Sequence, residues 1–597
     1  MSSGGSAYPG DKAPSNPLIE ILDVETLAFL PNLLDGETPP LPIPASPHPC
    51  ISDSRLPIPN SQLSTALTPT IPDPQPWHLR SLPLNQRTGT EIFQALYGSL
   101  LNEIPSLETV AVLLESPHPL PELAQPHQAH SRYSICAGPP RFWDGQPQLW
   151  TPDLGEILPT LAQRLQGGSS LTLVGDEADL AMQTLPFTGG WLGWLGYDLA
   201  WEIERLPSQN LDPLPFPVAL WYEPDTFAVL DHTEQRLWLA ATDPSDLDRL
   251  VDGVENLATQ RSQDFQDSHS PQDAQDSQTF QTSQDSQNSQ DANPSQRPDP
   301  QQSQASESPL TLGMTAEDYQ AAVVKAKQHI QAGDVFQVNL SLRFSTQTTA
   351  PSWDLYRQLH RINPSPFACY WHTPWGDVIS CSPERLIQVR GDQAQTRPIA
   401  GTRPRGSTPA EDTAYAETLL SNPKERAEHI MLVDLERNDL GRVCRWGTVR
   451  VDELLTVEYY SHVMHLVSNV VGQLLPDKTA VDLIRAAFPG GTITGCPKVR
   501  CMEIIEDLEP VRRSLFYGSC GYLDRRGYLD LNILIRTLLY GHGEGHGEGQ
   551  GEAATVWGQV GAGIVADSQP DREWRESLQK AKAQLLALGI TLTEDLA

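Results

Sequence analysis

The chain has 597 residues, too many for a single hydrophobic core, so we expect at least two folded parts together with non-globular segments. Its formal net charge of −34 argues against an extended nucleic-acid surface, although clustered basic side chains or a bound metal could still attract an anionic substrate. The sequence lacks a membrane-length apolar run, a signal-peptide pattern and a zinc-type pair among its eight cysteines. We therefore expect a soluble, cytoplasmic protein with reduced thiols.

The first part of the chain divides into an arm and a folded region. Residues 1–85 are dense in Pro, Ser and Leu, which predicts a largely disordered arm with one short helix near 18–34. Residues 86–258 are predicted to fold, beginning with helical spacing near Thr90. Strand-like runs occur at 110–116, 132–135, 171–174, 219–222, 227–230 and 237–240. The run G-G-W-L-G-W-L-G-Y-D at 189–198 is interpreted as a tight sheet core.

Residues 259–309 alternate Gln, Ser and Asp and contain almost nothing apolar, so they cannot offset the entropy of ordering. We predict a flexible acidic linker without a catalytic role. A second domain is predicted over 310–597. It opens with a helix that Thr315 and Asp318 cap and Gly333 ends, followed by the alternating strand F-Q-V-N-L-S-L-R-F. The G-H-G-E repeats at 541–552 are interpreted as a solvated hairpin loop rather than a metal site.

A glycine-rich turn, P-G-G-T-I-T-G-C-P-K, starts at Pro489 and leads into an amphipathic helix up to about residue 509. Its glycines allow a ligand to approach the backbone closely. Free amides at a helix start, with Lys498 and Arg500 nearby, suit a carboxylate or phosphate. The alternative is an ordinary loop-to-helix junction.

Four acidic residues of the second domain are candidates for chemistry: Glu384, Glu428, Glu573 and Glu576. Glu428 lies on an apolar helix face, where a carboxylate is costly to bury without a partner. Paired carboxylates suit Mg2+, which keeps positions open for a substrate carboxylate. The alternative is that all four are surface ion-pair residues, as most glutamates are.

Cationic residues occupy neighbouring turns and strand ends. They are Arg397, Arg403, Arg405, Arg536 and Lys580. A guanidinium after an apolar strand, as at Arg536, needs a carboxylate partner. Acids and cations together predict a Mg2+-dependent site for a small molecule that carries more than one carboxylate.

Several motifs follow one another in a specific order between residues 315 and 582. They are G-D-V-F-Q-V-N-L-S, C-S-P-E, R-P-I-A-G-T-R-P-R-G, K-E-R-A-E-H-I-M-L-V-D-L-E-R-N-D-L-G-R-V, Y-S-H-V-M-H-L-V-S, the glycine-rich turn, I-R-T and G-A-G-I-V-A-D-S. With them the chain resembles the chorismate-utilising family, which includes component I of anthranilate synthase and of aminodeoxychorismate synthase. The resemblance is weaker in the first part and omits the arm and linker. It implies an α/β (α+β) fold, with a large mixed antiparallel β-sandwich core to which both parts contribute strands, flanked by helices.

The resemblance also implies roles for individual residues. Glu428 and Glu576 match Mg2+ ligands, with Glu573 beside them, and Mg2+ would hold the ring carboxylate of chorismate. Glu384 matches the general acid for the departing 4-hydroxyl, and His465 matches the active-site histidine. The positions that match substrate-binding residues are Gly401, Thr402, Thr492, Lys498, Tyr517, Arg536, Gly561, Ala562, Gly563 and Lys580.

Within the family, two positions bear on the reaction. Gln337 stands where isochorismate-forming relatives place a water-activating lysine, which argues against that branch. Ala400 stands where some aminodeoxychorismate synthases carry a nucleophilic lysine, and alanine is also the anthranilate-synthase pattern. The strand around Asn339 and the turn at Pro489 are similar to the aminodeoxychorismate type. We expect amination of chorismate to 4-amino-4-deoxychorismate; anthranilate formation is the alternative.

The resemblance also bears on partners and regulation. No cysteine lies in the G-x-C-x-G elbow of a glutaminase, so we expect a separate glutamine amidotransferase subunit (component II) to supply ammonia. The L-L-E-S that ends in Leu114, Glu115 and Ser116 resembles a tryptophan feedback site; the alternative is a buried strand or a structural pocket without regulation. An inactive, ligand-sensing relative is disfavoured because all the expected acids, the histidine and Arg536 are retained.

Overall fold

The computed structural model describes residues 76–116, 132–166, 172–175, 177–267, 310–460, 463–542 and 553–591. The predicted helix near 18–34, most of the predicted linker and most of the 541–552 loop lie outside these ranges. The described part begins earlier than the predicted boundary at residue 86, with strand β1 (Trp77–Pro83). Helix α5 (Pro244–Asp267) likewise extends past the predicted boundary at 258. Trp77 explains the first difference, because its indole is fully buried against Phe227.

Within the described residues, most strands belong to two large sheets. The 13-stranded sheet has the order β12 (Thr311–Leu312), β13 (Gln337–Thr348), β25 (Ala554–Ile564), β24 (Thr537–Gly541), β15 (Gly376–Ser382), β14 (Phe367–Thr373), β2 (Ala111–Glu115), β3 (Tyr133–Ala137), β10 (Thr226–Asp231), β11 (Arg236–Ala241), β1 and β7 (Leu173–Val174), with β21 (Gly495–Cys496) beside β13. The 10-stranded sheet has the order β18 (Ile399–Pro404), β20 (Val463–Gln473), β17 (Gln393–Thr396), β16 (Arg385–Arg390), β23 (Leu529–Asn532), β22 (Ser519–Asp524), β8 (Gly190–Leu195), β9 (Ala219–Tyr222) and β6 (Leu149–Trp150), with β19 (Arg450–Tyr459) beside β20. A short ribbon pairs β4 (Phe142–Trp143) with β5 (Gln146–Pro147).

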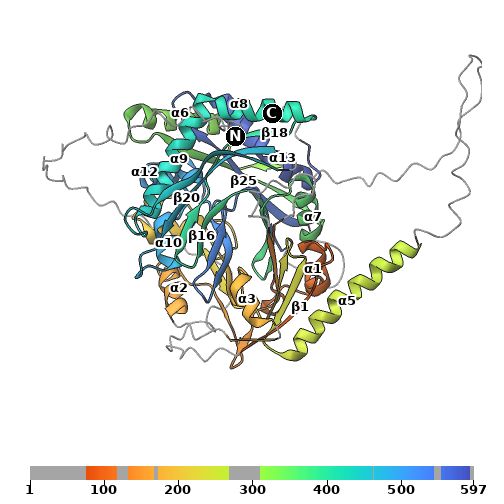
Figure 1. Cartoon of the computed structure of the whole chain (residues 1–597). Coiled ribbons are helices and arrows are strands. Elements are labelled where there is room, and N and C mark those ends of the chain that lie inside the picture. The colour runs from red at the N-terminus through yellow and green to blue at the C-terminus, as the bar shows by residue number, and fades with distance from the viewer. Residues whose placement is uncertain are drawn as a thin grey trace, which may run out of the picture. The chain divides into compact units, whose positions relative to one another are not determined.

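Both parts of the chain contribute strands to each large sheet, as the resemblance implied. In the first sheet β2 pairs with β14, and in the second β8 pairs with β22, both antiparallel. The early strands (red to yellow) therefore continue directly into strands from beyond residue 310 (green to blue) in Figure 1. Every residue of β8 is buried, which confirms the predicted tight core. Residues of both parts pack into one hydrophobic core, so the two predicted parts are not separate folding units.

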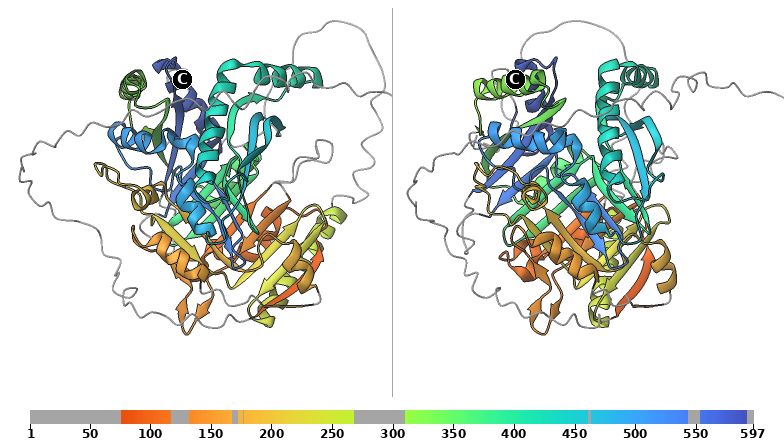
Figure 2. Two further views of the ribbon diagram at one scale, coloured as in Figure 1. Left: turned by 60° about the vertical axis from the view of Figure 1, so that its left-hand side comes forward. Right: turned by 90° about the vertical axis from the view of Figure 1, so that its left-hand side faces the viewer.

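The helices lie around the two large sheets. They are α1 (Gly89–Tyr97), α2 (Ile157–Gln166), α3 (Ala178–Thr184), α4 (Ala200–Ile203), α5, α6 (Ala316–Ala332), α7 (Ser352–Ile362), α8 (Pro409–Ser421), α9 (Pro423–Gly441), α10 (Ala480–Ala487), α11 (Gly491–Thr494), α12 (Lys498–Leu508) and α13 (Pro570–Ala587). Helices α6, α8, α9 and α13 lie at the same end of the sheets in Figure 1 and in both views of Figure 2. None of the helices in the described ranges has the length and apolar character needed to span a membrane.

The local predictions for the second domain are confirmed. Thr315 caps α6 by accepting a hydrogen bond from the Asp318 amide, and Gly333 ends the helix with a left-handed φ of 82°. Strand β13 follows directly, with its apolar residues Val338, Leu340 and Leu342 fully buried. Local sequence signals and tertiary packing agree along this stretch.

Candidate active site

The glycine-rich turn forms the short helix α11, the bridge strand β21 and the start of α12. Gly495 has a φ of +123°, and a Cβ there would meet the Gln337 carbonyl oxygen at 2.2 Å, so only glycine fits. The predicted cations are engaged elsewhere. The Lys498 ammonium lies 2.7 Å from Asp439, and Arg500 pairs with Glu503 and Asp334. The turn therefore offers its backbone and Thr492 to a ligand, whereas its two basic side chains are neutralised by protein carboxylates.

Glu384 lies between β15 and β16, where its side chain is almost completely buried. Burial raises the pKa of its carboxyl to about 8, and the nearby Glu436 carboxylate adds to the rise, while Thr492 and the Ile399 backbone oppose it. Burial also raises the pKa of Glu436, to about 7. A carboxyl with a pKa of about 8 carries its proton at neutral pH and can act as a general acid.

His465 is held beside the P-I-A-G-T motif by the pairing of β20 with β18. Thr402 lies opposite His465 in the ladder, and its hydroxyl is 2.9 Å from His465 Nδ1. Burial lowers the pKa of His465 to about 4, and the Arg536 guanidinium contributes to the fall, so the imidazole is neutral at pH 7. Gly401 forms a bulge with a φ of +69°, and a Cβ there would come within 2.9 Å of Glu425. Ala400 is half-buried beside Leu466 of β20.

Arg536, Tyr517 and Lys580 come together at strands β24 and β25. Arg536 donates a hydrogen bond of 2.9 Å to the Lys580 carbonyl, and the Lys580 ammonium lies 2.8 Å from the Gly561 carbonyl. A Cβ on Gly561 would be 3.0 Å from the Tyr517 hydroxyl. Arg536 has no carboxylate partner among the described residues, although burial lowers the pKa of its guanidinium. An anionic ligand would supply the missing charge.

Several buried polar atoms lie near Arg536 and the glycine-rich turn and make no hydrogen bond of normal geometry within the described residues. Asn339 is paired with Gly563 across β13 and β25, its amide donates to the Thr492 carbonyl at 3.3 Å, and its own carbonyl oxygen has no donor in the described part of the chain. Three more buried atoms here lack such a partner: Gln337 Oε1, Thr492 Oγ1 and the Tyr517 hydroxyl. Gln337 packs against Gly563, and Ala562 between the two glycines is fully buried opposite Leu340. Buried groups of this kind usually have partners, so the cluster fits a polar ligand.

The predicted metal ligands lie on the facing helices α9 and α13. Glu428 and Glu576 interact electrostatically, and burial raises the pKa of Glu428, with Asp567, Glu425 and Glu576 adding to the rise against Lys424. Burial also raises the pKa of Glu573, and Glu576 contributes. The pairs 425/428 and 573/576 are each three residues apart, so each pair shares one helix face. Among the residues that the structure describes, no three of these carboxylates lie within 4.8 Å of one another.

Glu425 is a residue of this site that the sequence analysis missed. One of its oxygens lies 2.8 Å from Arg403, and the other is buried without a partner among the described residues. Its position three residues before Glu428 was the available signal. A carboxylate oxygen left unpaired beside Glu428 fits a cation.

The arginines of the P-I-A-G-T motif are engaged by protein acids. Arg397 pairs with Glu458 and, at 2.7 Å, with Glu453, and Arg405 pairs with Asp412. Arg403 likewise pairs with Glu425, so each of the three predicted cations has an acidic partner within the protein. These pairs stabilise the turn.

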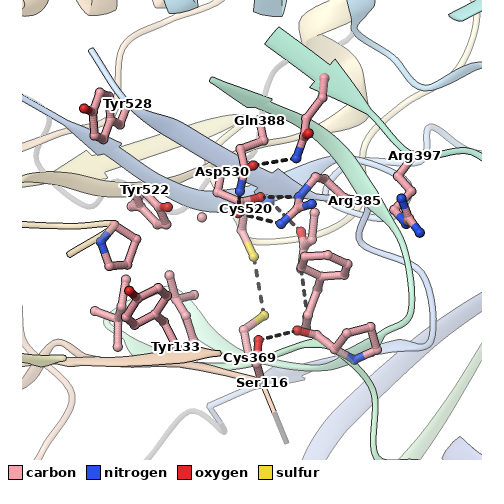
Figure 3. Close-up of a pocket in the computed structure, with 18 of the residues that line it drawn as sticks. Ser116, Tyr133, Cys369, Arg385, Gln388, Arg397, Cys520, Tyr522, Tyr528 and Asp530 are labelled. Carbon is pink, nitrogen blue, oxygen red and sulfur yellow. Dashed lines mark hydrogen bonds and ion pairs between the residues drawn. The ribbon is translucent and has the colours of Figure 1, made fainter. Parts of the chain in front are cut away.

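The L-L-E-S segment borders a separate cavity of about 450 Å³ between the two large sheets (Figure 3). Leu114, Glu115 and Ser116 line it on one side, and Arg385 and Asp530 line it on the other. The Glu115 carboxylate accepts hydrogen bonds from Thr90 and Tyr356, and Arg385 pairs with Asp530 at 2.8 Å. The charged groups of the cavity named here are thus paired within the protein.

Comparison with known proteins identifies the family. The family model of the chorismate binding enzyme matches residues 160–586. The chain belongs to the chorismate-binding enzyme family. It is 54% identical to an anthranilate synthase component I-like protein of Synechocystis, over 86% of this chain and 92% of that protein. It is 44% identical to aminodeoxychorismate synthase component 1 of Bacillus subtilis, over 68% of this chain and 78% of the relative.

The chain is also similar to two anthranilate synthases. Anthranilate synthase component 1 of Synechocystis is 39% identical, over 71% of this chain and 84% of that protein. The crystal structure of anthranilate synthase component I from Streptococcus pneumoniae superposes with a TM-score of 0.56 at 30% identity, covering 79% of this chain and 95% of that one. These similarities confirm the predicted fold and show that the protein is a chorismate-utilising enzyme.

Proposed function

We propose that the protein is component I of an aminodeoxychorismate synthase, which converts chorismate and ammonia into 4-amino-4-deoxychorismate and water. The strand around Asn339 and the turn at Pro489, which are similar to the aminodeoxychorismate type, support this choice over anthranilate formation. Sequence identity does not separate the two reactions, because the chain is 44% identical to the B. subtilis aminodeoxychorismate synthase, 41% identical to the Thermus thermophilus anthranilate synthase and 54% identical to the anthranilate synthase component I-like protein of Synechocystis.

The burial of the Glu384 side chain beside Thr492 and Glu436 is the single observation that carries the proposed chemistry. A hydroxyl is a poor leaving group and departs as water once an acid supplies a proton. Glu384 holds such a proton because burial raises its pKa to about 8. His465 is uncharged at neutral pH, so its role in this scheme is to hydrogen-bond and orient rather than to supply a proton.

The two carboxylates of chorismate match two sets of groups. Arg536, with Lys580 and the Tyr517 hydroxyl, is suited to the enolpyruvyl carboxylate, since its guanidinium has no protein carboxylate partner within the described chain. Thr492 and the Gly401 bulge are suited to the ring carboxylate. Binding at both ends would orient the 4-hydroxyl toward Glu384.

Mg2+ fits the acidic face between α9 and α13. Glu428 and Glu576 would hold it, with Glu573 and the unpaired oxygen of Glu425 beside them. When bound, Mg2+ neutralises the ring carboxylate and acts as a Lewis acid. Burial raises the pKa of Glu428 and the neighbouring carboxylates add to the rise, which Lys424 only partly offsets, so a bound cation would stabilise the charged form.

Ala400 and Gln337 limit the chemistry at the ring. Neither side chain offers a nucleophile or base, so no covalent intermediate forms at residue 400 and water is not activated at residue 337. Ammonia is therefore the nucleophile. A separate glutamine amidotransferase would supply it, because none of the eight cysteines of the sequence lies in the G-x-C-x-G elbow of a glutaminase.

Anthranilate synthesis is the second candidate, and Ala400 favours it, because alanine there is the pattern of anthranilate synthases. In that reaction ammonia enters at C2, and water and pyruvate leave. Incubation of the purified protein with chorismate, Mg2+ and ammonium distinguishes the two. A non-aromatic amine that an added lyase converts to 4-aminobenzoate supports our proposal, and fluorescent anthranilate formed without a lyase contradicts it.

A further inference from the structure

A second group of ligand-type side chains lies at the far end of the strands that carry the candidate active site. His372 is the last residue but one of the hairpin strand β14, Asp377 lies opposite it on β15, and His542 follows β24. Glu384 follows the other end of β15, and Arg536 precedes β24. Since β15 has seven residues, its two ends are roughly 20 Å apart. The group is therefore distinct from the chorismate site.

The three side chains converge on one point. His372 Nδ1 lies 2.9 Å from Asp377 Oδ1, and His542 Nε2 lies 3.4 Å from the same oxygen. One ligand atom from each residue lies within 4.8 Å of the others, and no other group of three such residues in the described ranges does so. The Thr373 carbonyl, 3.0 Å from His542 Nε2, adds a fourth donor. Ligands about 2.0–2.2 Å from a tetrahedral ion lie about 3.3–3.6 Å apart, so the His542–Asp377 distance already fits and the His372–Asp377 distance would lengthen by about half an ångström.

The group is buried and held in place by its surroundings. The side chains of His372, Asp377 and His542 are exposed by only 4%, 1% and 14%. The Tyr370 hydroxyl lies 3.5 Å from the second oxygen of Asp377 and 2.9 Å from Ser352, which fixes the carboxylate from behind. His372 directs Nδ1 toward Asp377, and its Nε2 on the other side of the ring is buried without a hydrogen-bond partner among the described residues.

We propose that His372, Asp377 and His542 bind a single first-row divalent cation of the Zn2+ type. Two imidazoles and one carboxylate suit Zn2+ and Co2+, whereas Mg2+ prefers oxygen ligands alone. The cation would join β14, β15 and β24 at the base of the G-H-G-E segment. The interpretation of that segment as solvated is wrong for His542, which is largely buried against Asp377.

Cobalt binding to the full chain tests the proposal. Metal-stripped protein is titrated with Co2+ in excess Mg2+, so that the carboxylates of α9 and α13 are occupied. We expect the visible absorption of Co2+ in a low-symmetry nitrogen and oxygen site, displaced by Zn2+. The His542→Gln variant should weaken Co2+ binding about 100-fold or more. Glu428→Gln should leave it unchanged, which separates this site from the proposed active site.

The matched control is His329→Gln, which removes a histidine paired with Asp334 at 2.7 Å but without a third ligand. It should bind Co2+ like the wild type. X-ray absorption of the Zn2+-loaded wild-type protein provides a readout that needs no variant, and two imidazole ligands are expected. Absence of the Co2+ absorption, unchanged binding in a folded His542→Gln variant, or oxygen-only coordination of Zn2+ would each overturn the proposal.

Discussion

The candidate active site and the cavity beside Glu115 contain similar residues but differ in how their polar groups are satisfied. In the cavity of Figure 3, Arg385 pairs with Asp530, and Glu115 accepts three hydrogen bonds from Thr90 and Tyr356. In the candidate active site, Arg536 has no carboxylate partner among the described residues, and burial raises the pKa of the Glu384 carboxyl. Buried groups in the first region stabilise the fold, whereas those in the second remain available to a substrate.

Buried polar groups therefore have two different roles in this protein. Satisfied networks fix the relative positions of two sheets, and unsatisfied groups persist where a ligand completes them. This difference also favours the interpretation of the L-L-E-S segment as structural, since Glu115 and Arg385 beside the cavity have partners within the protein.

Replacing Glu384 should have the largest effect. Glu384→Gln keeps the shape but removes the acidic proton, so we expect kcat to fall by about 10²–10⁴-fold. Steady-state kinetics with ammonium and chorismate measure it. Glu453→Gln, on the partly exposed side of the Arg397 pair, is the control and should retain activity. A Glu384→Gln variant with wild-type kcat would remove the acid from the mechanism.

Replacing the α9 and α13 carboxylates should weaken activation by Mg2+. Glu428→Gln and Glu576→Gln each remove one oxygen donor, and we expect the Mg2+ concentration for half-maximal rate to rise about 10–100-fold. Asp434→Asn on an exposed part of α9 is the matched control. Unchanged Mg2+ dependence in both glutamate variants would show that the metal binds elsewhere.

The pH profile should reflect the raised pKa of Glu384. This group is protonated below its folded pKa of about 8, so the active form is lost as pH rises through that value. Above it, we expect kcat to fall by about tenfold per pH unit. His465 should not contribute near neutrality, because its lowered pKa of about 4 keeps it uncharged. A flat profile up to pH 10 would contradict the assignment of Glu384 as the acid.

The cavity should respond in stability rather than in rate. Tyr356→Phe removes one hydrogen bond to the buried Glu115 carboxylate, and we expect the free energy of unfolding to fall by about 1–3 kcal/mol with kcat unchanged. Denaturant unfolding measures the loss, and Tyr415→Phe on the exposed face of α8 should show none. A large fall in kcat without a loss of stability would show that the cavity is coupled to catalysis.

Much of the fold could be predicted because its signals are local. The cap at Thr315, the alternation along β13 and the amphipathic helix after Pro497 all lie within a few residues of sequence. Strand β1 was missed because Pro and Ser around it mask a short run whose burial depends on Phe227, far along the chain.

The site residues could be identified by their motifs, but their environments could not. The pairing of Lys498 with Asp439, and of Arg397 with Glu458, depends on contacts about 60 residues apart. The pKa of Glu384 depends on burial that only the assembled sheets create. Proximity of His542 to His372 and Asp377 likewise requires the pairing of β24 with β15.

Product identification tests the central claim most directly. The purified protein is incubated with chorismate, ammonium and Mg2+, and the product is separated and characterised by mass spectrometry before and after addition of a lyase. We predict 4-amino-4-deoxychorismate, which still carries its enolpyruvyl group and yields 4-aminobenzoate only with the lyase. Anthranilate and pyruvate without a lyase would contradict the account.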